Sequence, residues 1–105
     1  MLGDLMGNLQ DKQSEMKSKL ALIKVEVSVG DGAIVVNANA NRQIENISIS
    51  KELFEQNDVE QMEDLVLEAV NRALDLAASK EAEESQKMIQ DIMPPGLGGL
   101  GNLFG

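Results

Sequence analysis

The sequence lacks most of the side chains that carry catalysis and metal binding. Its 105 residues include no cysteine and no histidine, which excludes disulfide bonds, thiolate nucleophiles, the usual zinc ligands and the commonest general base. Asp64, Glu68 and Asp75 share one polar helix face, where a solvated surface is far commoner than a paired-carboxylate site. We therefore predict that the protein is not an enzyme and has no catalytic residue, metal ligand, cofactor or small-molecule substrate.

Aromatic residues are scarce. Tryptophan and tyrosine do not occur, and the two phenylalanines are the only aromatic residues. Neither Phe54 nor Phe104 belongs to a basic stretch, so recognition of single strands or RNA by base stacking is disfavoured.

Long apolar runs are absent as well. No window approaches the roughly 18 apolar residues of a membrane span, and Asp4 stands where a secretory leader carries positive charge. We expect a cytoplasmic protein that does not contact a membrane.

The residues that are present suit a globular domain with an uneven charge. Hydrophobic residues make up 43% of the chain, which is an ordinary content for a folded protein. The net charge is −9, yet residues 1–24 hold four lysines and three acidic residues, whereas residues 51–105 hold four basic residues and twelve acidic ones. An anionic partner is expected to avoid the second part of the chain.

Residues 4–22 have the apolar spacing of a helix that pairs with another helix. Apolar residues recur every seven positions, with others in intermediate places. This coiled-coil-like seam consists of Leu2, Met6, Leu9, Met16, Leu20 and Ile23. Lysines border it on both sides, so their stems can cover the seam while the ammonium groups stay in water.

From residue 25 the apolar period changes to two, which predicts three short antiparallel strands in a meander. The apolar faces consist of Val25, Val27, Val29, then Ile34, Val36, Ala38, Ala40, then Ile47 and Ile49. The GDG triplet at 30–32 predicts a tight turn, and Ile44, which is out of phase, indicates a bulge or a turn. The opposite face is expected to carry Asn37, Asn39 and Asn41.

A long helix is predicted after a short turn at Ser50. Asp58 and Gln61 have the spacing of a capping box, and no breaker follows until Pro94 and Pro95. About 35 helical residues span roughly 50 Å, far more than three short strands can cover. The face expected to pack on the sheet ends near residue 77 and consists of Val59, Met62, Val66, Ala69, Val70, Ala73 and Ala77. The last four turns are therefore predicted to project as an arm.

A second, narrower stripe continues after the first one ends, and the helix of residues 4–22 is its expected neighbour. The stripe runs through Leu67, Asn71, Leu74, Ala78, Ala82, Ser85, Ile89 and Ile92. One helix on a three-stranded sheet leaves apolar surface and a strand edge open. We therefore predict a homodimer that packs through Leu67, Asn71, Leu74 and Ala78. Asn71 either fixes the register of that interface or meets water at its edge.

The predicted fold class is α+β, with an N-terminal helix, a three-stranded antiparallel meander and a long C-terminal helix in one domain, residues 1–93. Residues 94–105 are rich in glycine and leucine and are predicted to form a flexible tail. A docking segment for a partner is the alternative.

Several segments point to a known family. The chain opens with LGDLMGNLQDKQSEM and approaches its end with MPPGL. The central segment DVEQMEDLVLEAVNRALDLA carries a characteristic set, Asp58, Glu60, Glu63, Asp64, Leu65, Ala69, Asn71 and Ala73. With the order of elements, these segments resemble the YbaB/EbfC family of bacterial nucleoid-associated proteins over nearly the whole chain. The resemblance implies a small cytoplasmic, nucleoid-associated homodimer that binds duplex DNA with projecting helical arms.

Phosphate neutralisation dominates affinity for duplex DNA, so the candidate DNA contacts are lysines. They are Lys12, Lys17, Lys19 and Lys24 on the first helix, with Lys80 and Lys87 on the arm. Three glutamates adjoin Lys80, so we expect weak, salt-sensitive binding. Glutamine on an exposed helix usually meets water, so little base readout is expected from Gln10, Gln13 and Gln86. The alternative function is a non-enzymatic protein-interaction module that uses the arms and the Leu-rich tail and does not bind DNA.

Overall fold

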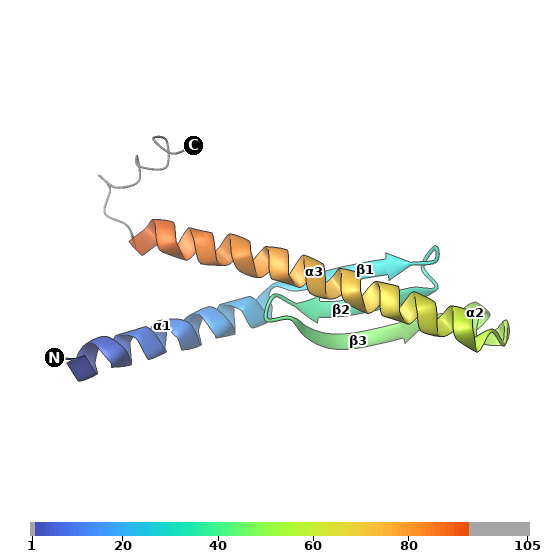
Figure 1. The fold of residues 1–105 in the computed structure, drawn as a ribbon, viewed down its shortest axis with the longest axis horizontal. Helices are drawn as coiled ribbons and strands as arrows, with labels where there is room; N and C mark the ends of the chain where they lie inside the picture. The colour runs from blue at the N-terminus through green and yellow to red at the C-terminus, as the bar shows by residue number, and fades with distance from the viewer. Residues whose placement is uncertain (1, 93–105) are drawn as a thin grey trace.

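The computed structural model describes residues 2–92, and its elements confirm the predicted α+β fold (Figure 1). In chain order the elements are α1 (Leu2–Leu22), β1 (Lys24–Val29), β2 (Ile34–Asn39), β3 (Gln43–Ile49), α2 (Lys51–Glu55) and α3 (Val59–Ile92). The predicted tail, residues 94–105, lies outside the described residues.

The three strands form an antiparallel sheet in the order β1-β2-β3. Val27 pairs with Val36, which pairs in turn with Ile47, so the apolar faces of all three strands share one side of the sheet. The register between β2 and β3 then shifts so that Ile44 pairs with Ala38. Of the two predicted alternatives, a bulge or a turn, this irregularity is the bulge, and it returns Ile44 to the apolar side.

The turn between β1 and β2 is tight, as the GDG triplet predicts. Gly30, Asp31 and Gly32 have φ angles of 62°, 57° and 90°, in the left-handed region that glycine adopts without steric cost. A Cβ atom at residue 30 would also lie 3.3 Å from the Cβ of Ala33. Both the dihedral angle and the available space therefore favour glycine at residue 30.

Side-chain caps begin the two C-terminal helices. The Ser50 hydroxyl accepts a hydrogen bond from the backbone N–H of Leu53 at 3.1 Å, which starts α2. The Asp58 carboxylate accepts one from the backbone N–H of Gln61 at 3.1 Å, which starts α3. The predicted cap at Asp58 is confirmed.

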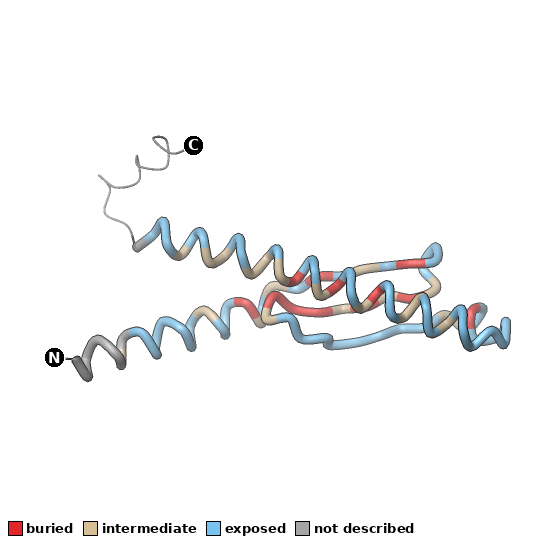
Figure 2. The backbone as a smooth tube through the Cα atoms, in the orientation of Figure 1, coloured by how far each residue is buried: buried red, intermediate tan, exposed pale blue. Residues whose placement is uncertain are grey.

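The core lies between α3 and the first two strands. Ala69, Ala73 and Ala77 are completely buried against Val36 and Ala38, because small side chains at four-residue spacing let the helix approach the sheet closely. Figure 2 shows buried residues along this contact and exposed residues along the whole of β3. Thus α3 leaves the apolar side of β3 largely uncovered.

One residue predicted to pack on the sheet does not do so. Val59 is 63% exposed, because α3 begins beyond the ends of the strands, next to α2 (Figure 1). Leu65, one turn and a half further along, packs against the core instead.

Asn39, which the sequence places on the face opposite to the apolar residues, is only 3% exposed. Its side-chain oxygen accepts a hydrogen bond from the backbone N–H of Asn41 at 2.9 Å, and its amide donates to Gln43 Oε1 at 3.0 Å. Since these local bonds satisfy both ends of the amide, the side chain can be buried in the turn between β2 and β3.

The predicted arm is confirmed, but its expected packing is wrong. The last turns of α3 and the whole of α1 extend from the same end of the sheet (Figure 1). The arm turns Glu84, Met88 and Asp91 toward α1. These residues continue the sheet-facing side of α3. The second stripe faces elsewhere, since its Ile89, on the arm, is 55% exposed, and its Leu67 borders a cavity with Ile49 of β3.

Candidate nucleic-acid interface

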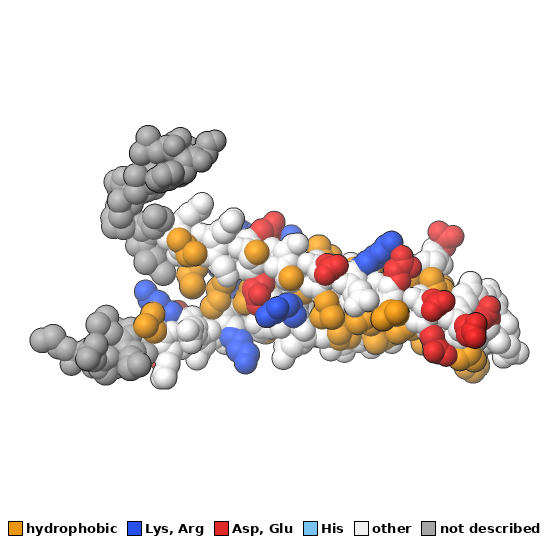
Figure 3. All heavy atoms as spheres, viewed as in Figure 1, with side chains coloured by type: hydrophobic (Ala, Val, Ile, Leu, Met, Phe, Trp, Pro, Cys, Tyr) orange, Lys and Arg blue, Asp and Glu red, His pale blue; other side chains and the backbone are white. Residues whose placement is uncertain are grey.

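The lysines predicted to contact DNA lie mainly at the end of the molecule from which α1 and the arm extend, whereas acidic side chains gather over α2 and the start of α3 at the other end (Figure 3). Lys12 and Lys19 line a cavity of about 230 Å³ between α1 and the arm, together with Glu15, Met16, Met88 and Asp91. Lys17 lies elsewhere on α1, in a shallow hollow formed by α1 alone. The structure therefore brings two of the three lysines of α1 next to the arm. The prediction that Lys24 lies on the first helix is wrong, because α1 ends at Leu22 and Lys24 begins β1.

Glu84 connects α1 to the arm of α3. Its Oε2 atom lies 3.0 Å from Lys19 Nζ, and its Oε1 atom accepts a hydrogen bond from Lys87 Nζ at 3.2 Å. The close approach of the Lys19 ammonium group and the hydrogen bond from Lys87 hold the pKa of Glu84 below its usual range. A glutamate is ionised at neutral pH in any case, and the lowered pKa keeps this carboxylate charged further into the acid range, so the contact is lost only as the pH falls through the lowered pKa.

Lys24 has a carboxylate neighbour at the base of α1. Its Nζ atom lies 2.8 Å from Glu45 Oε2 and donates a hydrogen bond to the Ala21 carbonyl oxygen at 3.1 Å. The hydrogen bond from Lys24 is the main cause that holds the pKa of Glu45 below its usual range. Lys24 thus ties the end of α1 to β3, a structural role that the sequence did not indicate.

The remaining basic groups near the arms differ in their pairing. Lys80 Nζ lies 3.6 Å from Glu83 on the same helix. Arg42, which the sequence-based prediction missed, lies at the base of the arms with its Nε atom 3.7 Å from Glu81. The sequence could have indicated Arg42 as a candidate DNA contact, because it is the only basic residue in residues 25–50. Lys12 and Lys17 form no ion pair with any side chain that the structure describes.

An open apolar groove, here called the β3–α3 groove, lies between these two elements. Its cavity of about 420 Å³ is lined by Ile49, Met62, Glu63, Val66, Leu67 and Val70. Leu67 is 62% exposed, and Ile47 and Ile49 are 43% and 44% exposed. Leu74 and Ala78 lie further along the same side of α3, beside the turn between β2 and β3 that contains Asn41 and Arg42. Asn71, which lies between Leu67 and Leu74 in the chain, is exposed. The residues predicted to form the dimer therefore share one open side of α3.

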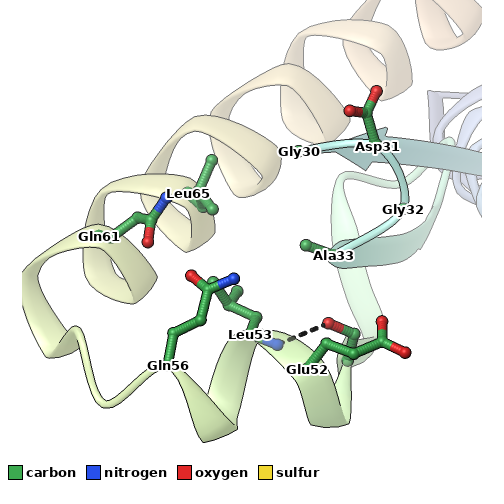
Figure 4. Close-up of a pocket in the computed structure, with 10 residues that line it drawn as sticks. Gly30, Asp31, Gly32, Ala33, Glu52, Leu53, Gln56, Gln61 and Leu65 are labelled. Carbon is green, nitrogen blue, oxygen red and sulfur yellow. Dashed lines mark hydrogen bonds between the residues drawn. The ribbon is translucent and has the colours of Figure 1, made fainter.

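A different hollow lies at the acidic end of the molecule. It has a volume of about 370 Å³ and lies between the β1–β2 turn, α2 and the start of α3. Figure 4 shows Gln56 and Gln61 directed toward it, with Leu53 and Leu65 between the walls. Asp31 and Glu52 belong to its lining and no basic residue does, so this hollow does not suit a phosphate.

Within residues 2–92, no cluster of three or more acidic side chains is arranged to hold a metal ion. No helix in the same range combines the length and the apolar character needed to cross a bilayer.

Comparison with known proteins adds sequence relatives and a shared fold. The profile of the YbaB/EbfC DNA-binding family matches residues 1–92. A nucleoid-associated protein of Chloroflexus aggregans is 35% identical over 91% of this chain and 88% of its own length. Another, from Thermodesulfovibrio yellowstonii, is 36% identical over 100% of this chain and 95% of its own length. The crystal structure of an uncharacterized protein from Helicobacter pylori has a TM-score of 0.71 at 20% identity, covering 84% of this chain and 92% of that one, which shows a common fold.

Proposed function

Because the chain belongs to the YbaB/EbfC DNA-binding family, as its sequence segments predicted, we propose that it is a nucleoid-associated protein that binds duplex DNA as a homodimer. The DNA contacts are salt bridges to phosphates from α1 and from the arm of α3, and they carry little sequence specificity. In the cell the protein is located on the nucleoid, in the cytoplasm. The observation that carries the proposal is the position of Lys12 and Lys19 in the lining of the cavity between α1 and the arm, with Lys87 paired to Glu84 on the arm.

Binding is weak and salt-sensitive in this proposal, because most of the lysines already have carboxylate neighbours. Four of the six, Lys19, Lys24, Lys80 and Lys87, lie within 4.0 Å of a glutamate. A phosphate that contacts such a lysine replaces an existing ion pair, so the net gain per contact is small. The surplus of acidic residues in α3 adds repulsion over a longer range.

The homodimer is supported by apolar surface that a single chain leaves uncovered. The β3–α3 groove exposes Leu67, Ile47 and Ile49, and Leu9 in the seam of α1 is 60% exposed. A second copy related by two-fold symmetry can bury the same groove on both protomers. A dimer also doubles the number of lysines that one duplex can contact, which helps weak individual contacts act together.

Binding to two duplexes of equal length and different sequence tests this function. Fluorescence anisotropy with labelled duplexes should give similar dissociation constants for both, in the range of about 1–100 μM at physiological salt. The absence of binding even at about 50 mM salt would contradict DNA binding. A strong preference for one duplex would contradict the low specificity.

The alternative function, a protein-interaction module, has its own test. Pull-down from a lysate is carried out with the full chain and with a chain that ends at residue 93. Protein partners that are lost with residues 94–105, with no DNA recovered by either chain, would favour the alternative.

A further inference from the structure

The carboxylate of Glu84 occupies a place where a phosphate would suit the surrounding charges. It lies between Lys19 of α1, at 3.0 Å, and Lys87 of α3, at 3.2 Å. Two ammonium groups from two different elements therefore converge on one anion. Its side chain is only 12% exposed, although that of its neighbour Glu83 is 59% exposed.

The same contact also limits the opening of the arms. Within residues 2–92, Lys19–Glu84 is the ion pair that links α1 to α3. Beyond it the two helices diverge (Figure 1) and enclose the cavity of about 230 Å³ lined by Lys12, Met16 and Met88. Weakening this contact should let the two helices separate more easily.

We infer that Glu84 is an internal competitor of DNA, a carboxylate that holds Lys19 and Lys87 until a phosphate displaces it. The inference rests on the proposed function, and it adds an autoinhibitory contact to it. When DNA binds, each of the two ammonium groups exchanges the carboxylate for a phosphate oxygen. Glu84 then lies next to the phosphate as a like charge, so it opposes binding both before and after the exchange.

Glu84→Gln and Glu83→Gln form a matched pair that separates this local competition from overall charge. Both substitutions remove one negative charge from adjacent positions of α3, so their long-range effects on DNA are nearly equal. Among the ion pairs of the described residues, Glu83 contacts only Lys80, at 3.6 Å. Lys80 is itself a candidate DNA contact, so Glu83→Gln releases one loosely paired lysine, whereas Glu84→Gln releases two closely paired ones. Glu84→Ala is a second variant, in case the glutamine amide forms new hydrogen bonds to the lysines' neighbours.

The experiment measures DNA affinity by fluorescence anisotropy and hydrogen exchange of α1 by mass spectrometry without DNA. We expect Glu84→Gln and Glu84→Ala to bind about fivefold more tightly than Glu83→Gln, since two ion pairs of modest strength no longer compete. The amides of α1 should exchange faster in both Glu84 variants than in Glu83→Gln.

The two proposals fail in distinguishable ways. Equal affinities of the Glu84 and Glu83 variants, with DNA binding intact, would overturn the competition and leave the proposed function standing. If no variant binds DNA, the proposed function is overturned together with the competition, whatever the hydrogen exchange shows. Unchanged exchange of α1 in the Glu84 variants would overturn the part of the inference that concerns the opening of the arms.

Discussion

Replacement of Lys12, Lys17, Lys19 and Lys24 by glutamine should lower the affinity for duplex DNA by about a hundredfold. If two of these lysines contact phosphates in each protomer, the dimer loses four contacts. At about 0.7 kcal/mol for each solvent-exposed ionic contact, the loss is about 2.8 kcal/mol, which corresponds to about two orders of magnitude. Anisotropy titration of the variant and the unchanged protein at the same salt concentration measures this loss.

A charge-matched pair of variants shows whether position matters or only net charge. Lys12→Gln with Lys19→Gln removes two charges beside the arm, and Lys51→Gln with Arg72→Gln removes two charges elsewhere, where each pairs with a glutamate on its own helix. The first double variant should lose much more affinity than the second, while thermal unfolding of both stays close to that of the unchanged protein. Equal losses would mean that α1 does not form the DNA contacts.

Leu67→Glu should convert the dimer into a monomer. Leu67 is 62% exposed in the single chain and borders the β3–α3 groove beside Glu63. A carboxylate at this position would be buried without a partner in the dimer and would lie near a like charge. Breaking a buried charge pair costs about 3–5 kcal/mol, because it leaves one charge buried without a partner. The carboxylate of Leu67→Glu would be in the same situation, so we expect a similar loss of dimerisation free energy. The dimer dissociation constant should therefore rise by more than about a hundredfold.

Phe54→Glu provides the control for Leu67→Glu. Phe54 is an apolar residue with a similar exposure, 68%, but it lies on α2 and not in the β3–α3 groove. Light scattering at micromolar concentration should give a dimer for the unchanged protein and for Phe54→Glu, and a monomer for Leu67→Glu. A monomeric unchanged protein would rule out the homodimer, and a dimeric Leu67→Glu variant would place the interface on another surface.

Local patterns in the sequence were sufficient to predict the elements of the fold except α2, which was predicted only as a short turn. The change of apolar period at residue 25, the GDG triplet and the cap at Asp58 are each set by neighbouring residues, and the structure confirms all three. The alanines at 69, 73 and 77 also predicted the packing of α3 on the sheet. The prediction for Val59 is wrong because its burial depends on how far α3 extends past the strands. The burial of Asn39 was not predicted, because it depends on hydrogen bonds in a turn.

The arrangement of charges was harder to predict, because it depends on residues far apart in the chain. Composition alone indicated the basic character of α1. Nothing in the sequence indicated that Lys19 meets Glu84, or that Lys24 meets Glu45, since these pairs form only when the helices and the sheet assemble. The second stripe of α3 was recognised from its spacing, but its direction, toward β3 and not toward α1, required the structure.

The salt dependence of DNA binding tests most directly whether lysines neutralise phosphates. Each neutralised phosphate of duplex DNA contributes about −0.9 to the slope of log K against log salt concentration, where K is the association constant. With about four to six phosphates contacted by a dimer, the slope should lie between about −3.6 and −5.4. A slope near zero, or no binding at low salt, would contradict the proposed phosphate contacts.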